Sequence, residues 1–186
     1  MAKRQLPSPE DLRQLLRYEP ETGKLFWKER DEKWFVACRH TPRAQAITWN
    51  KRFSGKEALA AVNSSGYRTG TIFGIMVQSH RIAWAIHYGE WPTGWLDHIN
   101  GTRTDNRITN LREATGSQNG SNRGVQKDSI SGIKGVRWHR RINRWQARIT
   151  VQRKQMHLGY FTTSDEAAAA YAEAAAKHHG EFARLA

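Results

Sequence analysis

The sequence of 186 residues contains one cysteine, five prolines and no long apolar segment. A single cysteine, Cys38, excludes an intrachain disulfide and a cysteine-rich zinc site. The longest apolar run, residues 71–77, is far too short to span a bilayer, and the first five residues lack the apolar segment of a secretory signal. We therefore expect a protein of a reducing, cytoplasmic compartment with no membrane partner.

Acidic residues are also scarce. The chain has 17 Asp and Glu against 30 Lys and Arg, which gives a formal net charge of +13. This balance predicts a polyanionic partner, because neutralising phosphates with Lys and Arg releases counterions. Charge alone does not separate DNA from RNA or acidic lipid. Hydrophobic residues make up only 38% of the chain, which favours small folding units over one large core.

One stretch concentrates the side chains that can do chemistry. Asp97 and His98 are adjacent, Asn110 follows His98 after 12 residues, and Asn119 follows after 9 more. A carboxylate and an amide oxygen are hard ligands for a divalent cation, and an imidazole can accept a proton from water near neutral pH. The second amide can orient the imidazole. The plainer alternative is that these polar residues only form turns, which the Asn-Gly and Asp-Asn steps favour.

These residues resemble the ββα-metal motif of HNH endonucleases, in the phage branch whose third motif residue is Asn. The resemblance implies that Asp97 and Asn119 are metal ligands, that His98 is the general base and that Asn110 orients His98. It implies one Mg²⁺ or Mn²⁺ ion per active site, in a bacterial or phage-infected cell. Arg107 and Arg112 are candidate phosphate contacts.

Local patterns predict the elements around this motif. We expect Trp34, Phe35, Trp49 and Phe53 to lie on strands, and His80 and His87 to be hydrogen-bonded supports rather than metal ligands. Thr115 or Ser117 is expected to cap the short helix that carries Asn119. The expected helices are 8–17 and 80–88, and the expected strands are 24–28, 66–72, 76–77, 95–98 and 111–114.

A second unit is predicted from residue 131 onward. Trp145, Ala147, Ile149 and Val151 alternate with polar residues, which is typical of a strand with one apolar face. Two further strands and an Ala-rich helix, with Thr163 as N-cap and Gly180 at its end, complete a three-stranded antiparallel sheet packed on one helix. The fold class is therefore α+β.

Residues 131–186 resemble the APETALA2-type DNA-binding domain, in which such a sheet lies in the major groove of DNA. Arg148 stands where that family usually has Glu, so base specificity does not carry over. By position, the resemblance implies a set of DNA contacts on the outer face and the turns of the sheet: Arg137, Arg140, Arg144, Arg148, Arg153 and His157.

Together these features predict a nuclease domain over residues 1–123, a linker over 124–130 and a DNA-binding domain over 131–186. We expect a metal-dependent endonuclease that acts on double-stranded DNA. Nicking of one strand is favoured, and the resemblance includes homing-type endonucleases. The resemblance favours a monomer, and no obligatory protein partner is inferred. The alternatives are a DNA-binding regulator that does not cut and an RNA-directed protein. The outer face of the sheet has few aromatic side chains for base stacking, which favours DNA over RNA.

Overall fold

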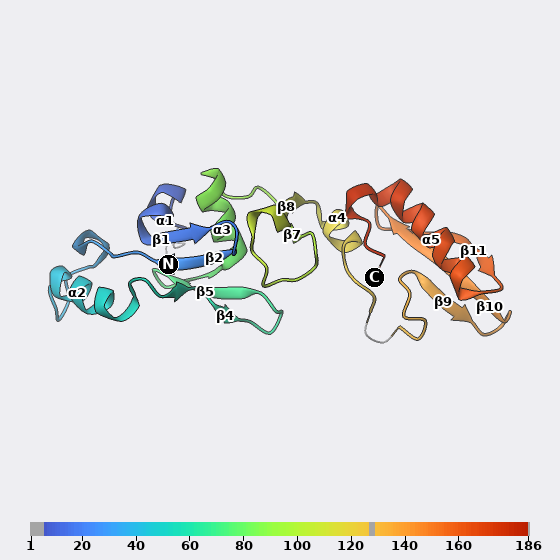
Figure 1. Ribbon diagram of the computed structural model, residues 1–186, viewed down its shortest axis with the longest axis horizontal. Coiled ribbons are helices and arrows are strands. Elements are labelled where there is room, and N and C mark those ends of the chain that lie inside the picture. Colours follow the sequence, from blue (N-terminus) through green and yellow to red (C-terminus); the bar gives the residue numbers. More distant parts are fainter. Residues whose placement is uncertain (1–5, 127–128, 186) are drawn as a thin grey trace. The chain divides into compact units, whose positions relative to one another are not determined.

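The computed structural model describes residues 6–126 and 129–185, and it divides into two compact units at Glu113/Ala114 (Figure 1). Residues 1–5 of the expected nuclease domain, 127–128 of the expected linker and 186 of the expected DNA-binding domain lie outside the described residues. The fold is mixed α+β, as the sequence predicts. No helix within the described ranges is both long enough and apolar enough to cross a membrane.

The first unit begins with a helix and a hairpin. Helix α1 (Pro9–Leu15) starts at Ser8, whose side chain accepts a hydrogen bond from the Asp11 backbone amide, as expected for an N-cap. Strands β1 (Leu16–Glu19) and β2 (Lys24–Trp27) pair antiparallel, and β2 also pairs with the short β3 (Glu57–Ala58). Leu12, Leu15 and Leu25 lie in the core of this unit.

The segment between β2 and β3 contains two helices and no strand among its described residues, so the expected strands at Trp34, Phe35, Trp49 and Phe53 are wrong. A 3₁₀ helix, η1 (Glu32–Trp34), precedes helix α2 (Pro42–Phe53). Thr41 caps α2, because its hydroxyl accepts from the Ala44 backbone amide at 3.3 Å, and Pro42 occupies the first turn. Trp49 and Phe53 are four residues apart and therefore share one face of this helix.

The elements that lead to the motif follow the sequence prediction closely. Strands β4 (Ala61–Val62), β5 (Arg68–Ile72) and β6 (Ile75–Gln78) form a second small sheet. Helix α3 (Ser79–Tyr88) follows and ends at Gly89, whose φ of 80° is the left-handed conformation usual after a helix. Strand β7 (Trp95–His98) then pairs with β8 (Leu111–Ala114), and the 3₁₀ helix η2 (Ile108–Asn110) lies directly before β8.

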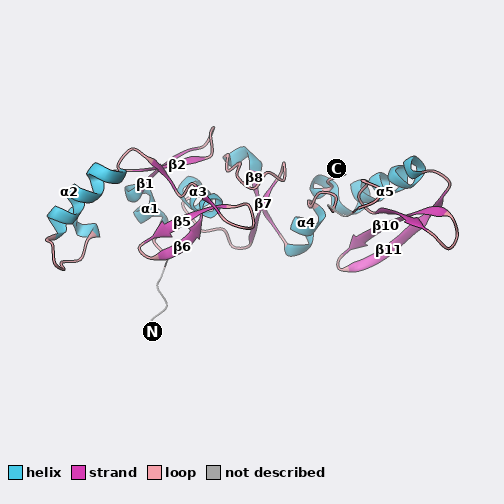
Figure 2. Cartoon of the chain, turned by 90° about the horizontal axis from the view of Figure 1, so that it is seen from below, coloured by secondary structure: helices cyan, strands magenta, loops and turns pink. Residues whose placement is uncertain are grey.

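The second unit starts at Ala114 and contains helix α4 (Gly116–Ser121). Thr115 caps α4 in a capping box with Gln118, which selects Thr115 over Ser117 as the N-cap. Strands β9 (Val136–His139), β10 (Arg144–Val151) and β11 (Lys154–Phe161) form an antiparallel sheet with β10 in the centre. Helix α5 (Ser164–His179) runs along this sheet, and the 3₁₀ helix η3 (Gly180–Phe182) follows it (Figure 2).

The core of the second unit lies between the sheet and α5, as predicted. Ala147 and Ile149 of β10 are buried against Ala167, Tyr171 and Ala175 of α5. The small side chains of α5 allow the helix to approach the sheet closely. Thr163 and Glu166 form the expected capping box, and the helix ends at Gly180. The opposite face of the sheet therefore carries the polar residues of the strands.

Candidate nuclease centre and basic sheet

Strand β7 brings two of the predicted site residues into a buried position. Asp97 and His98 are each only 4% exposed, and Leu96 before them is buried. The Asp97 carboxylate forms an ion pair with Arg112 of the neighbouring strand β8, in which Arg112 Nε donates to Asp97 Oδ2 at 3.0 Å. The candidate phosphate contact Arg112 is thus directed at Asp97.

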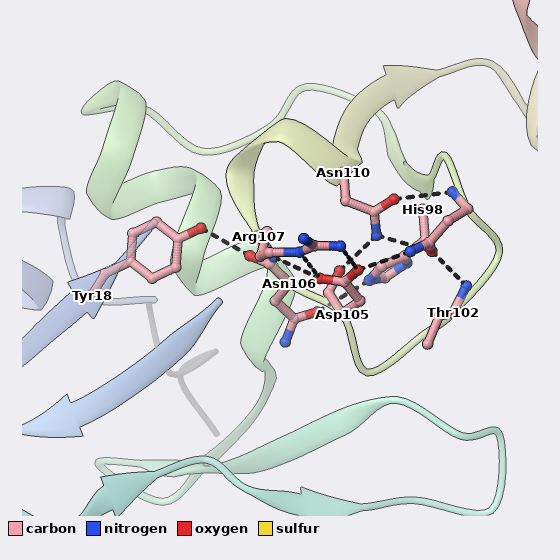
Figure 3. Close-up of polar contacts among 8 residues, drawn as sticks. Tyr18, His98, Thr102, Asp105, Asn106, Arg107 and Asn110 are labelled. Carbon is pink, nitrogen blue, oxygen red and sulfur yellow. Dashed lines mark hydrogen bonds and ion pairs between the residues drawn. The ribbon is translucent and has the colours of Figure 1, made fainter. Parts of the chain in front are cut away.

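The His98 ring has a defined hydrogen-bond partner. Its Nε2 atom lies 3.0 Å from the side-chain oxygen Oδ1 of Asn106 (Figure 3). An amide oxygen only accepts hydrogen bonds, so Nε2 must donate, and the neutral ring carries its proton on Nε2. Burial lowers the pKa of His98 from its usual value, while Asn106 and Asp97 act in the opposite direction. The ring is therefore neutral at physiological pH.

Two aromatic neighbours enclose this ring. The centroid of His80 on α3 lies 5.1 Å from that of His98 in an edge-to-face arrangement, and Tyr67 lies 5.9 Å away. His80 is buried, and its Nδ1 atom has no hydrogen-bond partner in residues 6–126 and 129–185. Burial lowers the pKa of His80 to about 3. Among the described residues, His80 therefore makes ring contacts rather than the hydrogen bond that was predicted for it, and His87 is exposed.

Asn110 organises the loop between β7 and β8. Its side-chain oxygen accepts from the Asn100 backbone amide at 2.9 Å. Its side-chain nitrogen donates to Asn100 Oδ1 at 3.1 Å and to the Asp105 carbonyl at 2.8 Å. The Asn110 carbonyl also accepts from the backbone amide of Ile99, directly after His98. Asn110 therefore holds the two ends of the loop together (Figure 3).

Arg107 is engaged within the same loop. Its Nε and Nη2 atoms donate to the two oxygens of Asp105 at 2.8 and 2.6 Å. This bidentate pair lowers the pKa of Asp105 to about 2. The Arg107 side chain is half exposed, so its outer edge faces solvent.

The remaining motif residue, Asn119, lies on helix α4 in the second unit and is half-buried. Its backbone amide donates to the Thr115 carbonyl at 2.9 Å, within the first turn of the helix. In the part of the chain that the structure describes, no group of three or more His, Cys, Asp or Glu could hold a metal ion.

The outer face of the sheet in the second unit carries the predicted DNA contacts. Arg137, Arg140, Arg144, Arg153 and His157 are exposed, and Arg148 is half-buried. Gln146, one of the polar residues that alternate with the apolar ones along β10, is only 7% exposed. Arg137 Nε donates to Gln146 Oε1 at 2.8 Å, and Gln146 Nε2 lies 3.2 Å from His157 Nδ1, so the two neighbours cover it.

A hollow of about 1090 Å³ opens beside this sheet, within the second unit. Six cations line it, and the described lining residues include no acid: Arg123, Lys134, Arg137, Arg140, Arg148 and Arg153. Such a concentration of one charge raises the local potential and attracts anions.

Comparison with known proteins shows which family the motif of the first site belongs to. A sequence model described as HNH endonuclease matches residues 77–121, which run from the end of β6 through α4 and contain all four motif residues. The class of the first site is therefore that of an HNH endonuclease domain, and proteins of this class typically use a divalent metal ion.

A curated phage protein extends the likeness beyond the motif. Protein 3.8 of Escherichia phage T7 is 32% identical over 109 residues, which is 57% of this chain and 88% of the phage protein. No solved structure matches the chain significantly. The chain belongs to the same family as Protein 3.8 and carries an HNH endonuclease domain.

The sequence prediction missed Asn106 as a residue of the site. Asp105, Asn106 and Arg107 stand inside the motif stretch, but only Arg107 was given a role. The sequence feature that could have indicated this role is a carboxamide eight residues after His98, in the loop that joins the two strands of the hairpin.

Proposed function

We propose that the protein is a metal-dependent endonuclease that hydrolyses phosphodiester bonds in duplex DNA, one strand at a time. The observation that carries this proposal is the buried Asp97–His98 pair on β7, inside the HNH match, with the His98 ring oriented by a hydrogen bond to Asn106. A neutral, fixed imidazole has the protonation state that a general base requires.

Asp97 and Asn119 would hold the ion. A carboxylate and a carboxamide supply hard oxygen donors, which suit Mg²⁺ or Mn²⁺, and Mg²⁺ often takes only one or two protein ligands. The donor set therefore fits one ion per active site. The chemistry that a bound ion supplies is polarisation of the phosphate and stabilisation of negative charge on the leaving oxygen.

The protein's own groups perform the remaining tasks. His98 accepts the proton of the attacking water while the water oxygen bonds to phosphorus and the bond to the 3′ oxygen breaks. The leaving 3′ oxygen takes up a proton from solvent, so the products are a 5′ phosphate and a 3′ hydroxyl. A positioned base contributes roughly 10²–10⁴-fold to the rate. Asn110 keeps His98 in place by closing the loop that follows it. Arg107, which is half exposed, and Arg112, which also pairs with Asp97, are the proposed phosphate contacts.

The second unit supplies DNA recognition in this proposal. Its exposed arginines, together with the basic hollow, support duplex DNA as the partner. We propose an APETALA2-type arrangement over residues 131–186, in which Arg137, Arg140, Arg144, Arg148, Arg153 and His157 contact the duplex, with residues 1–123 as nuclease domain and 124–130 as linker. One active site per chain favours nicking by a monomer, in a bacterial or phage-infected cell and in a homing-type role.

Conversion of supercoiled plasmid tests the proposal. The wild-type protein with Mg²⁺ should produce open circles from a sufficiently varied DNA library, and EDTA should abolish the product. His98→Ala should cut roughly 10²–10⁴-fold more slowly while binding duplex DNA as the wild type does. His87→Ala is the matched control, since this exposed histidine lies on α3 of the same unit.

Three results would contradict the proposal in different ways. Linear product in the earliest phase would refute single-strand nicking. Equal cutting by His98→Ala would remove His98 as the base. Tight duplex binding without conversion under any divalent ion would favour a regulator that does not cut.

A further inference from the structure

Asn106 is the most completely buried polar residue near the His98 ring. Its side chain is only 1% exposed, and its Oδ1 atom lies 3.0 Å from His98 Nε2. The other side-chain atom, Nδ2, is buried and has no hydrogen-bond partner among residues 6–126 and 129–185. A buried N–H group without a partner is unfavourable, and a leucine of similar shape would avoid this cost. An asparagine at this position is therefore explained by its oxygen rather than by packing.

The backbone of Asn106 is held by the N-terminal hairpin. The Tyr18 hydroxyl donates to the Asn106 carbonyl at 2.8 Å across 88 positions of sequence (Figure 3). The Ile108 backbone amide donates to the Pro20 carbonyl at 3.3 Å, in the turn between β1 and β2. Gly23 closes that turn with a φ of +70°, and a Cβ atom there would lie 2.5 Å from the Asn106 carbonyl carbon.

We propose that Asn106 is the positioning residue that fixes the tautomer and orientation of His98, and that the β1–β2 turn forms part of the frame of the active site. This inference rests on the proposed nuclease function, in which His98 is the base. It gives the segment from Tyr18 to Gly23 a second task besides packing in the core.

The physical reason lies in the two tautomers of neutral imidazole. In water they interconvert freely, and only one of them presents its lone pair in a given direction. The Asn106 oxygen accepts but cannot donate, so it selects the form with the proton on Nε2 and the lone pair on Nδ1. His80 and Tyr67 restrict the ring from other sides, but an aromatic contact does not choose between tautomers.

Asn106 and Asn110 have separate tasks in this arrangement. Asn110 bonds to Asn100 and to the Asp105 backbone, and so shapes the loop. Asn106 contacts the ring itself. Loss of Asn110 should therefore disturb the loop as a whole, whereas loss of the Asn106 oxygen should change the ring alone.

Three variants of the full chain test the proposal. Asn106→Leu removes the acceptor at nearly constant shape, and Asn106→Asp restores an acceptor oxygen. Asn50→Leu is the control, because the side chain of Asn50 bonds the Arg30 backbone through both its oxygen and its nitrogen, at 2.9 and 3.1 Å. It removes the same functional group from a half-buried position elsewhere in the first unit.

The first measurement is the pair of ring ¹⁵N shifts of His98 at a pH where the ring is neutral, assigned by comparison with His98→Ala. The wild type, Asn106→Asp and Asn50→Leu should show the Nε2-protonated form. Asn106→Leu should show a mixture of both tautomers. A single Nε2-protonated form in Asn106→Leu would overturn the proposal.

The second measurement is single-turnover nicking of plasmid under Mg²⁺. Asn106→Leu should cut roughly 10–100-fold more slowly, the range typical for outer-shell partners in metal sites, with unchanged duplex binding and recovery in Asn106→Asp. If Asn106→Leu does not fold, Tyr18→Phe removes only the hydroxyl that holds the Asn106 carbonyl and should give a smaller change in the same direction.

The two hypotheses fail separately. A wild-type protein that shows the expected tautomer but never cuts would overturn the nuclease function alone. A wild-type protein that cuts, together with an Asn106→Leu protein that cuts equally fast, would overturn the role of Asn106.

Discussion

Replacing Arg144 by alanine tests whether the outer face of the β9–β11 sheet binds DNA. Arg144 is exposed, and its guanidinium donates to the Asn143 carbonyl at 3.3 Å. The side chain lies on the polar face of β10, away from the core that contains Ala147 and Ile149. The substitution should therefore leave the stability of the second unit unchanged and alter binding alone.

The magnitude follows from counterion release. Each phosphate contact contributes about 0.9 to the slope of log affinity against log salt concentration. Losing the Arg144 contact should reduce that slope by about 0.9. When salt rises fourfold, one such contact accounts for about a 3.5-fold loss of affinity, because 4 raised to the power 0.9 is about 3.5. Removing Arg148 as well should double the change in slope to about 1.8.

Fluorescence anisotropy with a labelled duplex at several salt concentrations measures this slope. Lys177→Ala is the matched control, since Lys177 is an exposed cation near the end of α5, the helix that covers the opposite face of the sheet. Its slope should equal that of the wild type. If Arg144→Ala and Lys177→Ala change the slope equally, the effect is one of net charge and the sheet is not the DNA face.

Two further predictions concern stability. Gly135 has a φ of +72°, and an added Cβ would lie 2.2 Å from the Tyr171 ring, whereas Gly132 has a φ of +63° and an added Cβ would meet nothing within 4 Å. Gly135→Ala should therefore destabilise the second unit by about 1–3 kcal/mol more than Gly132→Ala. Equal shifts of the melting temperature in the two variants would contradict this packing. Burial holds the pKa of His80 at about 3, so the unfolded chain binds a proton at this residue before the folded chain does as the pH falls below 6.5, the usual pKa of histidine. The free energy of unfolding measured in urea should therefore fall by up to about 1.4 kcal/mol per pH unit because of this group. His80→Phe should remove this fall, and a variant with the same pH dependence as the wild type would refute the prediction.

The error over residues 30–66 has a local explanation. Trp34, Phe35, Trp49 and Phe53 alternate with basic residues, which favours strands, although they show no clear period. The start of α2 was nevertheless encoded in Thr41 and Pro42, an N-cap followed by a residue suited to the first turn. The apolar face is weak because Ala46 is the only buried residue of this helix, and so hydrophobic periodicity gave little signal.

Gln146 shows a second limit of pattern reasoning. The alternation of β10 places it on the polar face, where it is paired with Arg137 of β9 and Tyr160 of β11. Its burial depends on Arg137 from β9 and His157 from β11, which extend over it from both sides. Which polar residue of a sheet becomes covered is decided by its cross-strand neighbours, and these are known only once the strands have paired.

Sequence alone determined the chemistry of the candidate site and the local elements around it. The caps at Ser8, Thr115 and Thr163 act within three residues, and the alternation of β10 within a single strand, so their signals are complete in a short window. The tertiary structure alone decided that Asn106 bonds the His98 ring and that Tyr18, 88 positions earlier, holds the Asn106 backbone. Such contacts form only when the N-terminal hairpin and the loop after His98 come together as the core around Leu15 and Leu25 packs. No pattern within a short stretch of sequence specifies which residues of two distant segments will be in contact.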